Sequence, residues 1–128
     1  MTDYSIVADS SLHSLPYELS SLRDENGKLV LEIMGADGRM VCVVFDDYIF
    51  FSKQDEGDAL RTLGGMREAG VLGRAVIIRA KKSSLLRWFI DEGCGVKIEE
   101  KISHYIIVLV DDVVNVICIT PPLVIYNK

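Results

Sequence analysis

The most informative stretch of the chain is residues 28–52, KLVLEIMGADGRMVCVVFDDYIFFS. Apolar side chains recur in residues 28–33 with the two-residue period of a β-strand that buries one face. The segment 35–38, GADG, supplies turn residues, and its glycines are free to adopt positive φ. Residues 39–45 are again rich in β-branched side chains, which favour strands. The pattern predicts a β-hairpin, and residues 48–52, beyond a bend at Asp46-Asp47, predict a third strand.

The C-terminal part of the chain repeats this pattern. Two apolar runs, residues 104–110 and 113–120, flank Asp111-Asp112, which indicates a second tight hairpin. Pro121-Pro122 ends the hairpin. Residues 123–126 predict a final edge strand, because an edge strand tolerates a preceding proline.

Two segments carry the spacing of an amphipathic helix. In residues 55–69 the apolar side chains recur every three and four positions, and three acidic residues lie at the start, where the helix dipole favours carboxylates. Residues 83–92 predict a short helix that is capped by Ser83 or Ser84 and ends at Gly93.

Strands at residues 74–80 and 96–98 complete the predicted elements. Because the strands are grouped in hairpins towards both ends of the chain, the order favours an α+β fold. We expect an antiparallel or mixed β-sheet built from hairpins, with two helices packed on one side of it. No repeat or linker divides the sequence, so residues 1–128 are predicted to form a single domain in which residues 1–27 are an irregular or helical N-terminal segment.

The charge distribution limits the class of partner. The chain has a net charge of −5, residues 1–60 are strongly acidic, and residues 61–90 contain seven basic side chains against one acid, Glu68. Nucleic-acid binding needs clustered Lys and Arg that are not outweighed by acids, so we predict no nucleic-acid partner. An acidic chain is instead suited to a basic protein partner that is attracted by charge.

The sequence predicts a cytoplasmic location. The three cysteines, Cys42, Cys94 and Cys118, show no CxxC spacing, which indicates a reducing compartment. Cys42 and Cys118 lie in apolar runs and are predicted to be buried, whereas Cys94 lies in a Gly-Cys-Gly turn. The first residues have no signal-peptide pattern, and the longest apolar stretch is too short and too charged to span a membrane.

No catalytic or metal-binding motif is apparent. Zinc and calcium sites need ligand spacings that this chain does not contain, so we predict no metal and no cofactor. Only two histidines are available for acid–base chemistry. His104 begins an apolar strand, where we favour a structural role, and His13 lies in a polar segment and is expected to be exposed. The enzyme alternative is a site assembled in the fold from His104 and either Cys94 or Cys118.

Paired carboxylates recur through the chain and are the candidate partner-binding residues. Most such pairs are turn residues or solvated helix ends. Several on one face would make a negative patch that mimics the phosphates bound by a nuclease. The candidates that flank a single predicted strand are Asp46, Asp47, Asp55, Glu56 and Asp58. Trp88, the sole tryptophan, is interpreted as a core residue rather than an interface anchor.

Three groups of short motifs carry a family resemblance. They are FDDY (45–48) running into DEG (55–57); SS (83–84) with RWF (87–89); and HYII (104–107) followed by DVVNVI (112–117) and a proline. This layout, over about residues 28–125, resembles small bacterial proteins found with polymorphic toxins, including immunity proteins of contact-dependent growth inhibition systems. The resemblance implies a cytoplasmic protein that binds the C-terminal domain of a cognate toxin, often a nuclease, and blocks it. It supplies no catalytic residues.

The leading hypothesis is therefore an immunity protein that is not an enzyme, binds no membrane, and neutralises a toxin by occluding its active site. Two alternatives stay open: the Cys/His enzyme, and a structural or regulatory subunit that forms a homodimer through an apolar surface.

Overall fold

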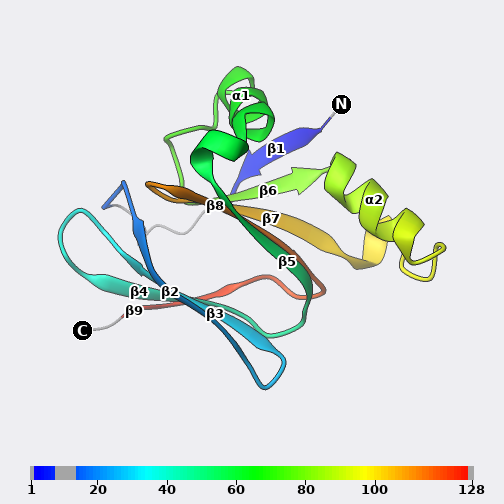
Figure 1. The fold of residues 1–128 in the computed structure, drawn as a ribbon, viewed down its shortest axis with the longest axis horizontal. Helices are drawn as coiled ribbons and strands as arrows, with labels where there is room; N and C mark the ends of the chain where they lie inside the picture. Colours follow the sequence, from blue (N-terminus) through cyan, green and yellow to red (C-terminus); the bar gives the residue numbers. More distant parts are fainter. Residues whose placement is uncertain (1, 8–13, 127–128) are drawn as a thin grey trace.

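The computed structural model describes residues 2–7 and 14–126. This part of the chain forms nine β-strands, two α-helices and two short 3₁₀ turns, which confirms the predicted α+β class (Figure 1). Every strand pairing within it is antiparallel.

The strands are divided between two sheets. The five-stranded sheet has the order β1-β6-β7-β8-β5 and the four-stranded sheet the order β2-β3-β4-β9. The strands of the first sheet are β1 (Asp3–Ile6), β6 (Ile77–Lys81), β7 (Ser103–Val108), β8 (Asp112–Cys118) and β5 (Tyr48–Asp55). Those of the second are β2 (Glu18–Glu25), β3 (Lys28–Met34), β4 (Met40–Phe45) and β9 (Leu123–Tyr126).

Both predicted hairpins are present. In the first, β3 pairs with β4 so that Leu29 lies opposite Phe45, and Gly38 in the turn has a φ of 81° that L side chains rarely adopt. In the second, β7 pairs with β8. As predicted, β9 is an edge strand. The bend at Asp46-Asp47 carries the chain from the four-stranded sheet into the five-stranded sheet, where β5 pairs with β8.

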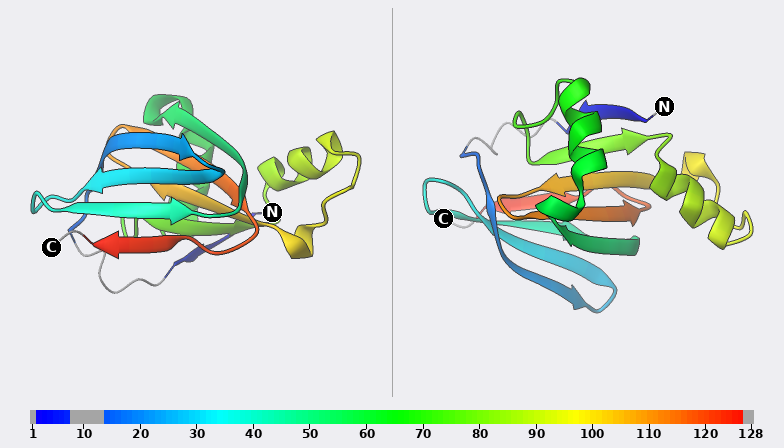
Figure 2. Two further views of the ribbon diagram at one scale, coloured as in Figure 1. Left: turned by 90° about the horizontal axis from the view of Figure 1, so that it is seen from below. Right: turned by 45° about the horizontal axis from the view of Figure 1, so that its top comes forward.

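The two sheets pack face to face around the main core (Figure 2). Leu31, Val43 and Phe45 of the four-stranded sheet are fully buried against Tyr105 and Val116 of the five-stranded sheet. Strands β7 and β8 are buried on both faces, because the other face of their sheet is covered by the helices. The result is three layers: sheet, sheet and helices.

The helices α1 (Leu60–Glu68) and α2 (Ser84–Glu92) lie on the same outer face of the five-stranded sheet (Figures 1 and 2). Met66 attaches α1 through a cluster with residues of β6, β7 and β8, and Leu86 attaches α2 near Ile117 of β8. Neither helix, at nine residues each, is long enough to cross a bilayer.

Three sequence-based predictions about elements are wrong. The segment 1–27 was predicted to be irregular or helical, but its described residues, 2–7 and 14–27, contain two strands, β1 and β2. Strand β1 pairs with β6, far along the chain, and β2 pairs with the following strand β3. The helix predicted over 55–69 begins only at Leu60, since β5 extends to Asp55 and residues Glu56–Asp58 form a 3₁₀ turn. Residues 96–98 form no strand, because the nearby strands β6 and β7 are already paired on both edges.

Candidate functional site

A groove of about 410 Å³ lies on the outer face of the five-stranded sheet, between the two helices. Its floor includes Tyr4 of β1, Ile106 of β7 and Ser52 of β5, while Thr62 of α1 and Trp88 of α2 contribute to its walls. All the described residues that line it are uncharged at neutral pH, apart from the titratable His104. The groove therefore combines apolar and aromatic surface with hydrogen-bonding groups, as ligand and recognition sites do.

Strand alternation places two polar side chains in the floor of this groove. Ile106 lies opposite Asn115, and His104 lies opposite Ile117, so His104 and Asn115 are diagonal neighbours on the helix-facing side of the sheet. Their neighbours Tyr105 and Val116 point to the opposite side and belong to the core between the sheets.

These two residues and Ser83 form a continuous buried hydrogen-bond network. The distance from Ser83 Oγ to His104 Nδ1 is 2.8 Å, and that from His104 Nε2 to Asn115 Oδ1 is also 2.8 Å. The exposed fractions of Ser83, His104 and Asn115 are 5%, 3% and 8%. Asn115 Nδ2 donates in turn to Ser52 Oγ at 3.5 Å. We call Ser83, His104 and Asn115 the Ser–His–Asn network.

The hydrogen-bond partners of His104 determine which of its ring nitrogens carries the proton. An amide oxygen only accepts hydrogen bonds, so His104 Nε2 carries a proton, and in the neutral ring Nδ1 is then an acceptor. Ser83 therefore donates its hydroxyl proton to Nδ1. Burial lowers the pKa of His104 below its ordinary value of 6.5, and the hydrogen bond to Asn115 opposes this only in part. His104 is thus neutral at pH 7.

This pKa shift predicts a pH-dependent stability. Because the folded protein disfavours protonated His104, the free energy of unfolding is expected to be highest above pH 6.5 and to fall as the pH drops below that value. The slope contributed by one such group is at most about 1.4 kcal/mol per pH unit. Urea denaturation at a series of pH values between about 7.5 and 5 measures it. In the variant His104→Gln the part of the pH dependence that comes from His104 should be absent. If the unfolding free energies of the two proteins changed equally with pH, His104 would not be its source.

The local sequence explains how Ser83 reaches the network. Ser83 is the N-cap of α2, as predicted, and its Oγ accepts a hydrogen bond from Leu86 N–H at 3.1 Å. Lys82, immediately before it, has a left-handed φ of 57°, which turns the chain sharply between β6 and α2. The Lys82 N–H donates a hydrogen bond to the Glu99 carboxylate, so a residue that follows α2 in the sequence stabilises this turn.

Trp88 is not a core residue, so the prediction made from the sequence is wrong for it. It is 48% exposed, and its ring lies 5.5 Å from that of Phe50 in an edge-to-face arrangement at the wall of the groove. Helix α2, nine residues long, buries Leu86 on the face that packs against the sheet. Trp88 is two residues further along the helix, so its side chain points partly away from that face. The side chain is thus available to a partner.

The five predicted acidic residues do not form one patch. Asp46 and Asp47 lie in the turn before β5, whereas Asp55, Glu56 and Asp58 lie at its other end. An eight-residue strand spans about 26 Å, so the two groups are separated by the length of β5. All five residues are exposed.

The group at the far end of β5 is adjacent in sequence to the groove but does not line it. Glu56 N–H donates to the carbonyl oxygen of Asp111 at 2.9 Å, which brings a further exposed acid from the turn between β7 and β8. Gln54, next to Asp55, lines the groove. We call Asp55, Glu56, Asp58 and Asp111 the acidic end of the groove. The other group lies away from it, where Asp46 pairs with Lys28 at 3.5 Å and Asp47 accepts a hydrogen bond from Thr120.

The Cys/His site of the enzyme alternative is not assembled. Both ring nitrogens of His104 bond to Ser83 and Asn115, and not to a thiol. Cys118 is buried in the core between the sheets, and burial raises its pKa to about 12, so it is not a thiolate at neutral pH. Cys94 is exposed in the turn after α2. The other histidine, His13, lies outside the described residues.

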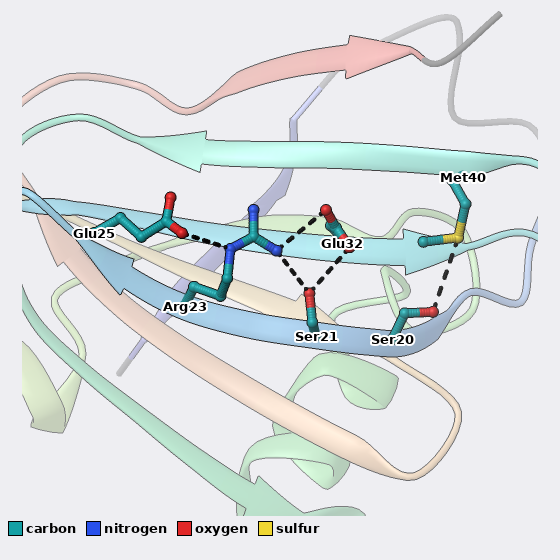
Figure 3. Close-up of polar contacts among 6 residues, drawn as sticks. All are labelled: Ser20, Ser21, Arg23, Glu25, Glu32 and Met40. Carbon is teal, nitrogen blue, oxygen red and sulfur yellow. Dashed lines mark hydrogen bonds and ion pairs between the residues drawn. The ribbon is translucent and has the colours of Figure 1, made fainter.

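A second polar cluster lies on the open face of the four-stranded sheet (Figure 3). Arg23 Nε pairs with Glu25 at 3.0 Å, and its Nη1 contacts Glu32 at 3.1 Å and Ser21 Oγ at 3.0 Å. The single guanidinium faces two carboxylates, so the cluster keeps one net negative charge, and its ion pairs lie in a partly exposed setting where such pairs contribute little to stability. We interpret this cluster as a solvated sheet surface.

The open face also bears on the homodimer alternative. Leu123 and Ile125 of the edge strand β9 are 55% and 45% exposed, and they lie opposite Val44 and Cys42 of β4. Cys42 is half-buried on this face rather than fully buried as predicted. A homodimer through these residues stays a prediction.

Among residues 2–7 and 14–126, no cluster of three or more metal-ligating side chains forms. No protein-family model, curated protein sequence or solved structure significantly matches this chain.

Proposed function

We propose that this chain is a cytoplasmic immunity protein that binds the C-terminal domain of a cognate bacterial toxin and neutralises it by occluding the toxin's active site. The observation that carries the proposal is an exposed aromatic anchor at an open groove, together with exposed acids around the end of β5, where Gln54 lines the groove. The motif resemblance and the net charge of −5 agree with it.

The aromatic wall supplies the kind of residue that dominates protein interfaces. Trp88 is half-exposed yet braced by Phe50, so its ring is held in place before a partner arrives. Tryptophan is enriched among the residues that contribute most to binding energy. Since the ring is already ordered, binding costs little additional side-chain entropy.

The acidic end supplies charge complementarity. Lys and Arg residues of a nuclease active site are arranged to bind phosphates, and exposed carboxylates can occupy the same positions. A standard interface buries about 800 Å² on each partner, or about a tenth of the 7461 Å² accessible surface of this chain. Such an area can include the acidic end, the groove and Trp88 together.

Calorimetry with the toxin domain encoded beside this protein tests the proposal. We expect a one-to-one complex whose affinity falls with added salt. The variant Trp88→Ala should weaken binding by about 30-fold, as for a hot-spot residue. Absence of binding to that toxin domain would refute the proposed function.

A matched pair of charge variants tests the location of the interface. Glu56→Gln/Asp58→Asn and Asp46→Asn/Asp47→Asn each remove two negative charges, at opposite ends of β5. Only the first pair should slow association and reduce its salt dependence, since charges near an interface act mainly on the association rate. Asp55 is left unchanged because its carboxylate caps the following 3₁₀ turn. Equal effects of the two pairs would show that only overall charge matters.

A further inference from the structure

The Ser–His–Asn network has the geometry of an activated nucleophile. A hydroxyl within hydrogen-bond reach of a neutral imidazole, which is itself oriented by a third group, is the diagnostic arrangement of nucleophilic catalysis. Here the two distances are both 2.8 Å, and all three residues line the same groove. A helix N-cap alone requires only the bond from Leu86 N–H to Ser83 Oγ, so capping does not explain the two further bonds.

We propose that Ser83 is a nucleophile and His104 its general base, and that together they cleave a small uncharged acyl ester bound in the groove, with Asn115 as the positioning residue. This activity is distinct from toxin binding: it shares the groove and Trp88 with the proposed interface, but its chemistry depends on Ser83, His104 and Asn115.

The reaction balances with the ester and water alone. Ser83 Oγ bonds to the carbonyl carbon while its proton passes to His104 Nδ1, and the carbonyl electron pair moves to the oxygen. When the tetrahedral intermediate collapses, the bond to the alcohol oxygen breaks and the alcohol leaves with the proton from His104. Water then attacks the acyl-serine in the same way, which releases the carboxylic acid and restores the hydroxyl.

The first turn of α2 can stabilise the developing negative charge. The backbone N–H groups of Ser84 and Leu85 have no acceptor within the helix, since the first N–H groups of any helix lack one. Both residues line the groove next to Ser83. Such N–H groups and the positive end of the helix dipole are the elements of an oxyanion hole.

The lining of the groove indicates the substrate class. A charged substrate would lose its water of solvation without gaining an oppositely charged side chain from the lining. Trp88 and Phe50 offer apolar surface for an acyl chain, whereas Ser52 and Thr62 offer hydrogen bonds. The volume, about 410 Å³, corresponds to a small molecule.

Labelling of the full-length chain with a fluorophosphonate probe tests the proposal. Ser83 Oγ would bond to phosphorus as fluoride leaves. Intact-mass spectrometry should show one probe per chain, and peptide mapping should place it on Ser83. Hydrolysis of p-nitrophenyl acetate gives an independent readout. Failure to label the folded protein, or labelling of another residue in place of Ser83, would overturn the proposal.

The variants separate chemistry from folding. Ser20→Ala is the matched control and should be labelled normally, because Ser20 is an exposed serine on β2 of the four-stranded sheet and does not line the groove. Ser83→Asn keeps a side chain that caps helices but removes the nucleophile, so labelling should disappear. His104→Gln should slow labelling by about 100-fold or more, the usual contribution of a general base. Wild-type protein in concentrated urea should not be labelled, and labelling that persists there would show that the reaction needs no folded site.

Asn115 is tested by a pH profile. The labelling rate should rise with pH as His104 loses its proton. In Asn115→Asp a carboxylate beside Nε2 favours the protonated ring, so the midpoint should move to higher pH. An unchanged midpoint would show that the labelling rate does not follow the ionisation of His104, and would contradict its role as the general base. Because labelling needs no toxin, this experiment and the calorimetric one can fail independently.

Discussion

Replacement of Phe45 by alanine is expected to lower the free energy of unfolding by about 3–5 kcal/mol, the usual cost of removing a buried phenylalanine side chain. Phe45 is fully buried at the end of β4, and its ring lies 6.1 Å from that of Tyr105 in the facing sheet. The ring therefore joins the two sheets. Its loss removes buried apolar surface and leaves a cavity that rigid strands on both sides cannot close.

Urea denaturation measures this effect, and Trp88→Ala is the control. Trp88 is the larger side chain but is already 48% exposed, so its removal should cost about 1 kcal/mol or less. Equal destabilisation of the two variants would contradict the burial of Phe45 in the core between the sheets.

Replacement of Met66 by alanine should give the second large effect, about 2–5 kcal/mol. Met66 is fully buried between α1 and the five-stranded sheet, in a cluster with Ile78, Ile106 and Val113. It is the one buried residue of α1, so the helix depends strongly on it. Because Thr62 of α1 lines the groove, this variant should also loosen one wall of the groove.

The same helix provides the control for this prediction. Leu60→Ala removes as many side-chain heavy atoms as Met66→Ala, but from a position that is 71% exposed, so the change in unfolding free energy should stay within about 0.5 kcal/mol. Hydrogen exchange should show faster opening of α1 in Met66→Ala only. Unchanged protection of α1 in that variant would mean that other contacts hold the helix.

Local patterns in the sequence were sufficient to predict the hairpins and the helix α2. The two-residue period of β3, the turn containing Gly38 and the cap at Ser83 act over a few residues, so they are visible in one short segment. Strands β1 and β2 were missed because their residues lack a strong period. The pairing of β1 with β6, some 70 residues later, stabilises a segment that is not evidently a strand by itself.

The candidate site was only half visible in the sequence. The sequence predicted that Ser83 or Ser84 caps the helix and that His104 lies at the start of a strand, and the cap at Ser83 and the position of His104 in β7 agree with this. Asn115 was missed, although a single polar residue in the apolar run 113–118 was a usable signal, since a buried amide requires hydrogen-bond partners. Trp88 was assigned to the core because a helical period gives the direction of a side chain but not the extent of the surface that covers it.

What the sequence by itself determined was the α+β class, the local hairpins, the capped helix and the acidic balance, because each depends on residues close together in the chain. What only the tertiary structure decided was the division of the strands into two sheets and the meeting of Ser83, His104 and Asn115. These residues come from α2, β7 and β8 and meet only when β6, β7 and β8 pair in register. Register, in turn, is set by which faces of the strands are buried, and burial is a property of the whole fold.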